Sequence, residues 1–281
     1  MSNRRMRLGL TLPGQGPVSE LVDQTRRAEQ LGFDVVLLID HLGFAAPLPP
    51  LVAMAAAAPA VRVSNMVLNA CFYRPALLAR DLASVDSATD GRLEIGLGAG
   101  YVEAEFVVAG LPFPKPSARL QLLKEHITEI RRQLSDPANT PPSVQKPPPI
   151  MVAGMGDRML AMAAQHADIV AVGGMGGEAA VAERAAYILN QAGVLADDIE
   201  LAFSFFQVSL DDRNDLSVLH QVAPDASEVD LRGAATLLDG TVSAAVDRVQ
   251  RLREANFSYF TFHKTEATSW DTLAKLTSAL K

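Results

Sequence analysis

The sequence contains a single cysteine, Cys71, among its 281 residues, so no disulfide bond can form within the chain. It also lacks Cys-x-x-Cys pairs and histidine-rich segments, so the sequence gives no indication of a metal site. No charged-then-apolar leader opens the chain. With one cysteine and no such leader, we expect the protein to be cytoplasmic.

Basic residues and long apolar runs are also scarce. The chain has 25 Lys and Arg against 32 Asp and Glu, which gives a net charge of −7. Because nucleic-acid-binding surfaces are clustered and basic, we expect no nucleic-acid partner. The most apolar stretch, residues 45–61, contains four prolines and is shorter than the about 20 residues that a membrane span needs. We therefore expect no contact with a membrane.

Strand-like and helix-like segments alternate along the whole chain. The predicted strands are residues 6–13, 33–40, 61–70, 92–100, 150–154, 167–174, 199–210 and 257–263. Amphipathic helices are predicted between them, among them one capped by Ser117 and one capped by Thr241. This alternation predicts an α/β fold, a (β/α)8 TIM barrel that forms a single domain over residues 1–281. An open, doubly wound sheet is the alternative, but the first strand-to-helix turn, "TLPGQGPVS", lacks the full nucleotide-binding fingerprint.

Two segments of the chain are predicted to be irregular. Residues 101–116, which contain three prolines, are expected to form a long loop after the fourth strand. The polar residues 211–230, which follow the seventh strand, are expected to form a solvated loop and a short helix.

The stretch "GRLEIGLGAGY" carries glycines at alternate positions, Gly96, Gly98 and Gly100. A dinucleotide fingerprint needs the spacing G-x-G-x-x-G between a strand and a helix, whereas here Tyr101 and a long loop follow. Two interpretations stay open. A flat ligand could lie against the exposed backbone, or the strand could be packed tightly inside a barrel.

Polar residues lie at the ends of two of the predicted strands. Asp40, His41 and Asn69 lie at strand ends that face the mouth of a barrel, where they could take part in chemistry or simply form turns. Histidine is the side chain best suited to titrate near neutral pH. The stretch "AGMGDR", residues 153–158, leads into a helix whose N-terminal amides, with Arg158, could hold an anion. "GGMGG", residues 173–177, repeats this arrangement, although both stretches could be plain flexible turns.

Four stretches together resemble the luciferase-like monooxygenase superfamily, and within it the branch of oxidoreductases that depend on coenzyme F420, a deazaflavin. They are "DH" at 40–41, "RPALLARDLASVDSATDGRLEIGLGAGY" at 74–101, residues 153–174 and residues 237–263. The second stretch is the most specific, and all four occur in the order of the family. The resemblance implies a barrel with the cofactor at the mouth formed by the C-terminal ends of the strands.

The resemblance also implies roles for individual residues. Asp40, His41 and Asn69 would flank the deazaflavin ring, and a cis peptide bond typical of the family would lie near Met66, Val67 and Leu68. The backbone at Gly98, Ala99, Gly100 and Tyr101 would line the side chain of the cofactor. Gly154, Met155, Gly156 and Arg158 would hold its phosphate.

The activity implied by the resemblance is hydride transfer between coenzyme F420 and an unidentified small organic substrate. His41 is the first candidate and Tyr101 the second for the proton-transferring group. The loop 101–116, with Phe106 and Phe113, would close over the site as a lid. Some sugar-phosphate dehydrogenases of the family carry a glutamate where this chain has Tyr101, which argues against a sugar-phosphate substrate.

Two alternatives remain open at this stage. One is a monooxygenase of the same family that uses flavin mononucleotide (FMN), and the other is a non-catalytic protein that binds F420 or a flavin. The resemblance also implies a homodimer.

Overall fold

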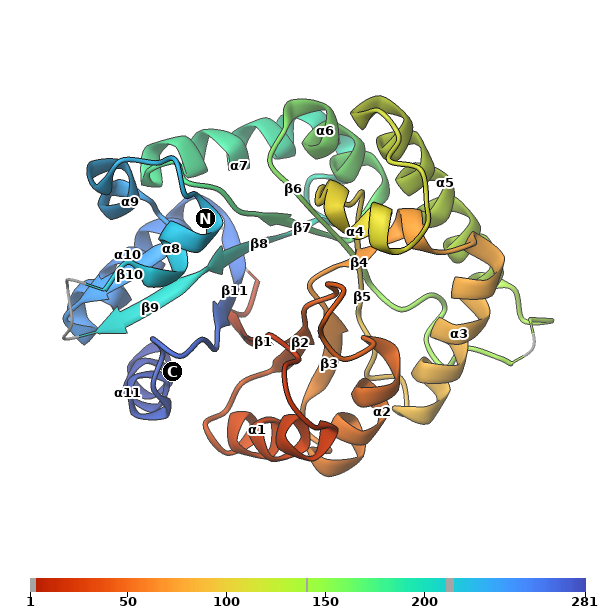
Figure 1. Cartoon of the computed structure of the whole chain (residues 1–281), viewed down its shortest axis with the longest axis horizontal. Coiled ribbons are helices and arrows are strands. Elements are labelled where there is room, and N and C mark those ends of the chain that lie inside the picture. The colour runs from red at the N-terminus through yellow and green to blue at the C-terminus, as the bar shows by residue number, and fades with distance from the viewer. Residues whose placement is uncertain (1–3, 140, 211–214) are drawn as a thin grey trace.

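The computed structural model describes residues 4–139, 141–210 and 215–281. Figure 1 shows a central parallel sheet surrounded by helices. Nine strands form this sheet, in the order β3-β2-β1-β11-β8-β7-β6-β5-β4. They are β1 (Arg7–Leu12), β2 (Val35–Leu38), β3 (Arg62–Asn65), β4 (Leu68–Asn69), β5 (Ile95–Gly98), β6 (Ile150–Gly154), β7 (Ile169–Val172), β8 (Glu200–Phe205) and β11 (Phe257–His263).

Strands β3 and β4 are the two halves of the predicted third strand, and together they occupy one position of the barrel. The peptide bond between Met66 and Val67, which separates them, is cis, at the place where the family resemblance predicts it. β4 pairs with β5, and a bridge from Val63 to Leu93 continues this contact along β3. Because β1 also pairs with β11, the ring of strands closes. The predicted (β/α)8 TIM barrel is therefore confirmed.

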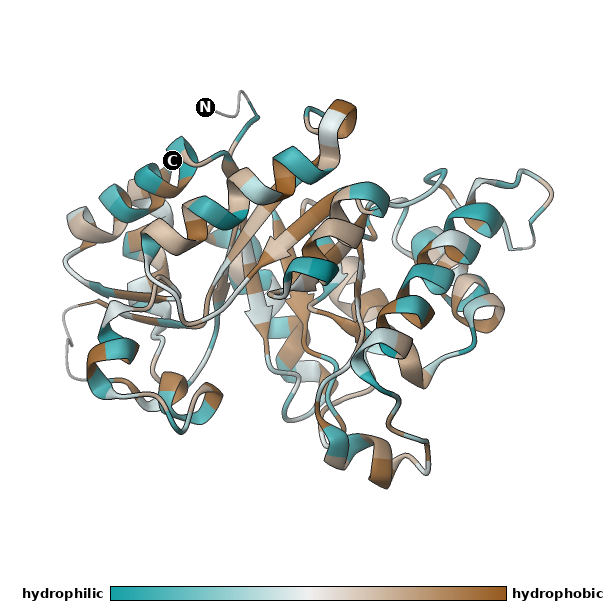
Figure 2. Ribbon diagram, turned by 90° about the horizontal axis from the view of Figure 1, so that it is seen from above, coloured by the Kyte–Doolittle hydropathy of each residue, from teal (hydrophilic) through white to brown (hydrophobic). Residues whose placement is uncertain are grey.

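Helices cover the outside of the barrel (Figure 1), and hydrophilic and hydrophobic residues alternate along them (Figure 2). The larger ones are α1 (Val18–Gln30), α2 (Leu48–Ala57), α3 (Pro75–Ala88), α5 (Pro116–Ser135), α6 (Asp157–His166), α7 (Glu178–Ala192), α10 (Val242–Glu254) and α11 (Trp270–Leu280). Short ones are α4 (Glu103–Val108), α8 (Ser217–Val222), α9 (Glu228–Gly233), η1 (Ala70–Phe72) and η2 (Gly193–Leu195). In α5, the predicted apolar positions Leu123, Ile127 and Ile130 are buried against the barrel.

The strands are apolar on both faces because each face has its own covering. Along β11, Phe260 and Phe262 belong to the large core between the sheet and the helices. Tyr259 points to the other side, into a small core inside the barrel that includes Leu37 and Met151. Continuous apolar strands are typical of such doubly covered parallel sheets.

Several predicted details differ from the structure. The predicted strand 199–210 is split at Phe206, because the amides of Phe206 and Gln207 both donate to the carbonyl of Thr236. Its second half is β9 (Gln207–Leu210), which leaves the barrel and pairs in parallel with β10 (Leu237–Gly240). Ser117 does not cap α5, which begins at Pro116, since proline suits the first helical position and Lys115 takes the cap position. Thr241 caps α10 as predicted, accepting a hydrogen bond from Ala244.

The prediction for the polar segment 211–230 is wrong in part. Residues 211–214 lie outside the described residues. The rest forms the two short helices α8 and α9, and it is not simply solvated, because it carries a small apolar core of its own. That core contains Leu216, Leu219 and Leu231.

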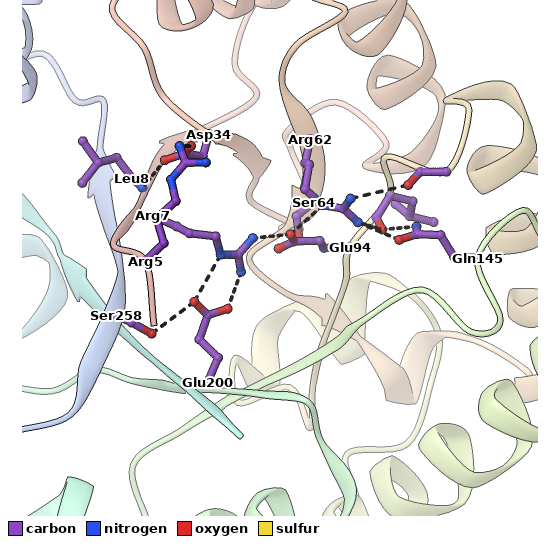
Figure 3. A network of polar contacts seen from close by, with 12 residues as sticks. Arg5, Arg7, Leu8, Asp34, Arg62, Ser64, Glu94, Gln145, Glu200 and Ser258 are labelled. Carbon is purple, nitrogen blue, oxygen red and sulfur yellow. Dashed lines mark hydrogen bonds and ion pairs between the residues drawn. The ribbon is translucent and has the colours of Figure 1, made fainter. Parts of the chain in front are cut away.

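Charged side chains close the end of the barrel at which the strands begin (Figure 3). The carboxylate of Glu94, 1% exposed, lies 2.5 Å from Arg7 Nη1 and 2.8 Å from Arg62 Nε. Arg7 also pairs with Glu200 and lies over the ring of Tyr259. Burial lowers the pKa of Arg7, but the two glutamates more than compensate and raise it above its ordinary value. This end of the barrel is therefore filled, and the opposite end is left for a ligand.

Candidate functional site

The residues predicted at the barrel mouth lie close together. Asp40, after β2, accepts a hydrogen bond through Oδ2 from the amide of Asn69 at 3.0 Å. A Cβ built on Gly100, after β5, would lie 2.4 Å from the side-chain amide of Asn69. The side chain of Asn69 also accepts a hydrogen bond from the amide of Cys71, so that it has a turn-forming role as well. Three strand ends thus meet at one place.

His41 is in contact with a residue that we did not single out from the sequence. Its Nδ1 lies 2.6 Å from Oε1 of Glu105, on α4. The ring of His41 also meets those of Tyr101 and Phe44 edge-on, at centroid distances of 6.1 and 6.0 Å. The side chains of His41 and Glu105 are 31% and 16% exposed. An acid, an imidazole and a phenol are therefore gathered at the mouth.

Burial governs the ionisation of the neighbouring groups. It raises the pKa of Asp40 above the ordinary value, an effect that the amide of Asn69 partly opposes. Burial, together with the nearby Glu105, also raises the pKa of Tyr101. A phenol is protonated at neutral pH, so Tyr101 can donate a hydrogen bond from its exposed position.

The segment 101–116, predicted as a loop and lid, contains α4 and is anchored at both ends. Phe106, 1% exposed, packs between Phe72 and Phe113, with both ring-centroid distances at 5.0 Å. The guanidinium of Arg119 lies 4.2 Å from the centre of the Phe113 ring, and its Nε donates to the carbonyl of Gly100. These contacts fasten the segment to Phe72 and to the turn at Gly100, whereas its role as a lid stays a prediction.

The alternate glycines of β5 are explained by packing. A Cβ on Gly96 would lie 1.8 Å from the carbonyl oxygen of Asn65, and one on Gly98 would lie 2.6 Å from Cγ2 of Val67. The bulged chain between β3 and β4 fills the space that side chains would need. Of the two interpretations of this stretch, tight packing is therefore confirmed, whereas a role in lining a cofactor stays a prediction.

The two glycine-rich turns predicted as an anion cradle lie side by side. Sδ of Met155 would come within 3.2 Å of a Cβ built on Gly174. Gly156 stands at the cap position of α6, and a Cβ built there meets no atom within 4 Å, so the helix N-terminus is open. Arg158 is exposed in the first turn of α6. Asp157, in the same turn, is paired with Arg184.

At the mouth ends of β1 and β11, two buried polar atoms have no hydrogen-bond partner among the described residues. They are Oγ1 of Thr11 and Nε2 of His263, both buried, on residues that pair in register across β1 and β11. Thr11 lies two residues after Gly9 on β1, and a Cβ built on Gly9 would face Tyr259 of the core inside the barrel, so Thr11 is on the inner side of the sheet. Burial lowers the pKa of His263 to about 4, so its ring is neutral at physiological pH. The sequence pattern did not indicate either residue.

The described ranges lack two other kinds of site. They hold no group of three or more His, Cys, Asp or Glu side chains close enough to bind a metal ion. Among the helices that the structure describes, none combines the length and the apolar character needed to cross a membrane.

Curated proteins similar to this chain are F420-dependent glucose-6-phosphate dehydrogenases. The one from Intrasporangium calvum is 36% identical over 124 residues, 40% of this chain and 37% of the relative. The one from Microbacterium testaceum is 40% identical over 124 residues, 41% of this chain and 36% of the relative. The chain thus spans little more than a third of the length of these curated relatives.

Solved structures with the same fold include a reductase, a dehydrogenase and a monooxygenase. The coenzyme F420-dependent tetrahydromethanopterin reductase from Methanopyrus kandleri has a TM-score of 0.80 at 16% identity, covering 99% of both chains. An F420-dependent secondary alcohol dehydrogenase has a TM-score of 0.79 at 17% identity, covering 99% of this chain and all of the other. A long-chain alkane monooxygenase reaches 0.81 at 14% identity, covering 99% of this chain and 90% of the other. These likenesses show the fold alone.

The family itself follows from the sequence match. Residues 6–228, most of the chain, match the luciferase-like monooxygenase family. This range contains the cis bond at Met66–Val67, the glycines of β5 and the pair of Asp40 and His41. The chain belongs to the luciferase-like monooxygenase family.

Proposed function

We propose that the protein is an oxidoreductase that transfers a hydride between coenzyme F420 and a small organic substrate. The observation that carries this proposal is the assembly of Asp40, His41 and Asn69 with the turn at Gly100 at one barrel mouth. The family resemblance implies that these residues would flank the cofactor, and their meeting at one place supports this role. The names of the curated relatives, which are F420-dependent dehydrogenases, support the same cofactor.

The residues at the mouth fit a ring with polar edges and an anionic side chain. Thr11 Oγ1 and His263 Nε2 offer hydrogen-bonding capacity that the described protein groups leave unused. The open N-terminus of α6 at Gly156, with Arg158 in its first turn, suits a phosphate. The negative charge of Asp157 is compensated by its pairing with Arg184.

The residues have the following roles in this proposal. Asp40, His41 and Asn69 flank the deazaflavin ring, and Met66 and Val67 support the ring from behind. Gly98, Ala99 and Gly100 line the side chain of the cofactor. The phosphate is held by Gly154, Met155, Gly156 and Arg158. When bound, the deazaflavin supplies the redox chemistry. His41 exchanges the proton of the substrate, and Tyr101, as a protonated phenol, is the second donor at the mouth. Phe106 keeps the covering segment in place, so that water is excluded from this side of the mouth.

Two alternatives lead to different observations. An FMN-dependent monooxygenase would use the same barrel mouth, and the phosphate site does not discriminate between the two cofactors. A non-catalytic binding protein needs no titrating group beside the ring, and the contact between His41 and Glu105 argues against it. The homodimer, the cytoplasmic location and a substrate other than a sugar phosphate stay predictions.

A titration of the apoprotein with F420, and separately with FMN, tests the proposal. Cofactor fluorescence should report binding of F420 with a Kd in the micromolar range or tighter, and weaker binding of FMN. Arg158→Ala should weaken F420 binding by about tenfold, because a charge-assisted bond to phosphate is lost. Arg80→Ala, an exposed arginine of α3, serves as the control and should change nothing. A preference for FMN would favour the monooxygenase, and binding without turnover of any substrate in a broad screen would favour the binding protein.

A further inference from the structure

The contact between Glu105 and His41 determines which nitrogen of the imidazole carries the proton. An ionised carboxylate can only accept hydrogen bonds, and its Oε1 lies 2.6 Å from Nδ1 of His41. The hydrogen must therefore be on Nδ1. We propose that Glu105 is a positioning residue that holds His41 in the Nδ1–H tautomer and leaves Nε2 as its proton acceptor. This inference rests on the proposed function and adds a role for Glu105 to it.

The other groups around His41 do not compete for Nδ1. Asp40, which precedes it on the chain, directs Oδ2 to the amide of Asn69. Tyr101, from the turn after β5, and Phe44 meet the imidazole through ring edges. Within the described ranges, Glu105 makes the one side-chain hydrogen bond to the His41 ring. The tautomer is set by the hydrogen bond that the other ring nitrogen makes, and here that bond comes from α4.

Glu105 is held in place by its neighbours on the chain. Phe106, the next residue, is buried between Phe72 and Phe113 and anchors α4 to the barrel. Arg119 ties the turn before α4 to α5 through the carbonyl of Gly100. The Glu105 carboxylate is 16% exposed, so solvent screens its interaction with the imidazole only in part. A fixed carboxylate of this kind orients a histidine for proton transfer.

This tautomer suits a substrate that bears a hydroxyl group. In the oxidation, the carbon that carries the hydroxyl would lose a hydride with its two electrons, and a bound deazaflavin would be the group that accepts it. The hydroxyl proton passes to Nε2 of His41, and the substrate leaves as a carbonyl compound. The imidazolium that forms is then paired with the Glu105 carboxylate, which stabilises its charge. The reverse reaction uses the same atoms in the opposite order.

Nitrogen NMR of the apoprotein tests the tautomer without any cofactor. The chain has five histidines, and His41→Asn identifies the signals of His41. At about pH 8.5, where ordinary imidazoles are neutral, we expect Nδ1 of His41 to be protonated and Nε2 to be unprotonated. Glu105→Ala should give a mixture of tautomers, and Glu103→Ala, an exposed acid on the same helix, should leave the spectrum of His41 unchanged. A wild-type His41 with the proton on Nε2 would overturn the proposal.

Kinetics of the loaded enzyme form the second part of the test. Glu105→Ala should lower kcat by about 10- to 100-fold, within the range of general acid–base effects, while the Kd of F420 changes less than twofold. Glu105→Gln, which keeps the shape and loses the charge, should retain the fold and lie between wild type and alanine. An unchanged kcat in both variants would overturn the proposal. If wild type fails to bind F420, the proposed function fails, whereas the NMR result still decides the role of Glu105.

Discussion

The carbonyl oxygen of Asn65 occupies the space beside Gly96 in which any larger residue would place its Cβ. The two atoms would be 1.8 Å apart, and the clash would be with backbone, which has little freedom to move. Gly96 therefore allows β3 and β5 to approach each other at the point where the chain bulges between β3 and β4. Even the addition of a single methyl group at Gly96 is therefore expected to disturb the packing of β5.

Gly96→Ala should destabilise the protein by at least about 1–3 kcal/mol, the range for overpacking a tight core. The free energy of unfolding in urea or guanidinium measures the effect. Gly233→Ala is the matched control, because a Cβ at that position meets no atom within 4 Å and its φ is not positive. It should change stability by less than about 0.5 kcal/mol. Equal stability of the two variants would contradict the packing explanation of the glycine run.

Glu94→Ala should cost about 3–5 kcal/mol of stability, as expected when one partner of a buried ion pair is removed. The substitution leaves Arg7 and Arg62 facing each other at the closed end of the barrel without the carboxylate between them. Asp23→Ala breaks the exposed pair with Arg26 and should cost less than about 1 kcal/mol. Denaturant unfolding at neutral pH compares the two. If both variants lose the same small amount, the network at the strand starts contributes no more than a surface pair.

The buried ring of His263 should make stability depend on pH. Its pKa is about 4 in the folded protein and about 6.5 in an unfolded chain, so the unfolded state takes up the proton first. The contribution of His263 is fully present above about pH 6.5 and is lost as the pH falls toward 4. The loss is on the order of 3 kcal/mol.

Comparison of wild type with His263→Gln isolates this contribution from the other acid-sensitive groups. As the pH falls from 7 to 4, the free energy of unfolding of wild type should decrease more than that of His263→Gln. A difference that is constant over this range would mean that His263 titrates normally in the folded protein.

Arg119→Lys should loosen the segment that covers the mouth. Lysine lacks the planar fork with which Arg119 stacks on Phe113 while its Nε donates to the carbonyl of Gly100. Hydrogen–deuterium exchange of the amides in residues 101–116 should become faster by about tenfold, which corresponds to about 1.4 kcal/mol of local stability. Arg132→Lys, an exposed change on the same helix, should leave this exchange unaltered. Slow exchange in both variants would show that the aromatic contacts suffice to hold the segment.

Much of the barrel was predictable because its strands are apolar on both faces. β6 and β11 have the predicted bounds, since Pro149 precedes one and the Asn256 turn precedes the other. The meeting of Asp40 with Asn69 was also predictable, because parallel strands end at the same edge of the barrel. These inferences need only the local hydropathy pattern of the sequence and the parallel direction of the strands.

Other features depend on contacts that the local pattern does not encode. Glu105 and Glu103 are both acids of one short helix, and the burial of Phe106 decides which of them turns toward His41. The division between β8 and β9 lies within one strand-like run, so the sequence pattern gives no sign that Phe206 marks a change of partner. The helix α11 was missed, although Ser269 caps it in the usual way.

The departure of the chain from the barrel at Phe206 has a consequence for how this protein can vary. The barrel needs β8 only as far as Phe205, and the next barrel strand, β11, begins at Phe257. The segment between them carries its own pair of strands and its own apolar core, which contains Leu219 and Leu231. Surface substitutions and changes of length there can remodel the surroundings of the barrel end while the folding core of the barrel is kept. The sequence of the segment between β8 and β11 can therefore change without a matching change in the barrel.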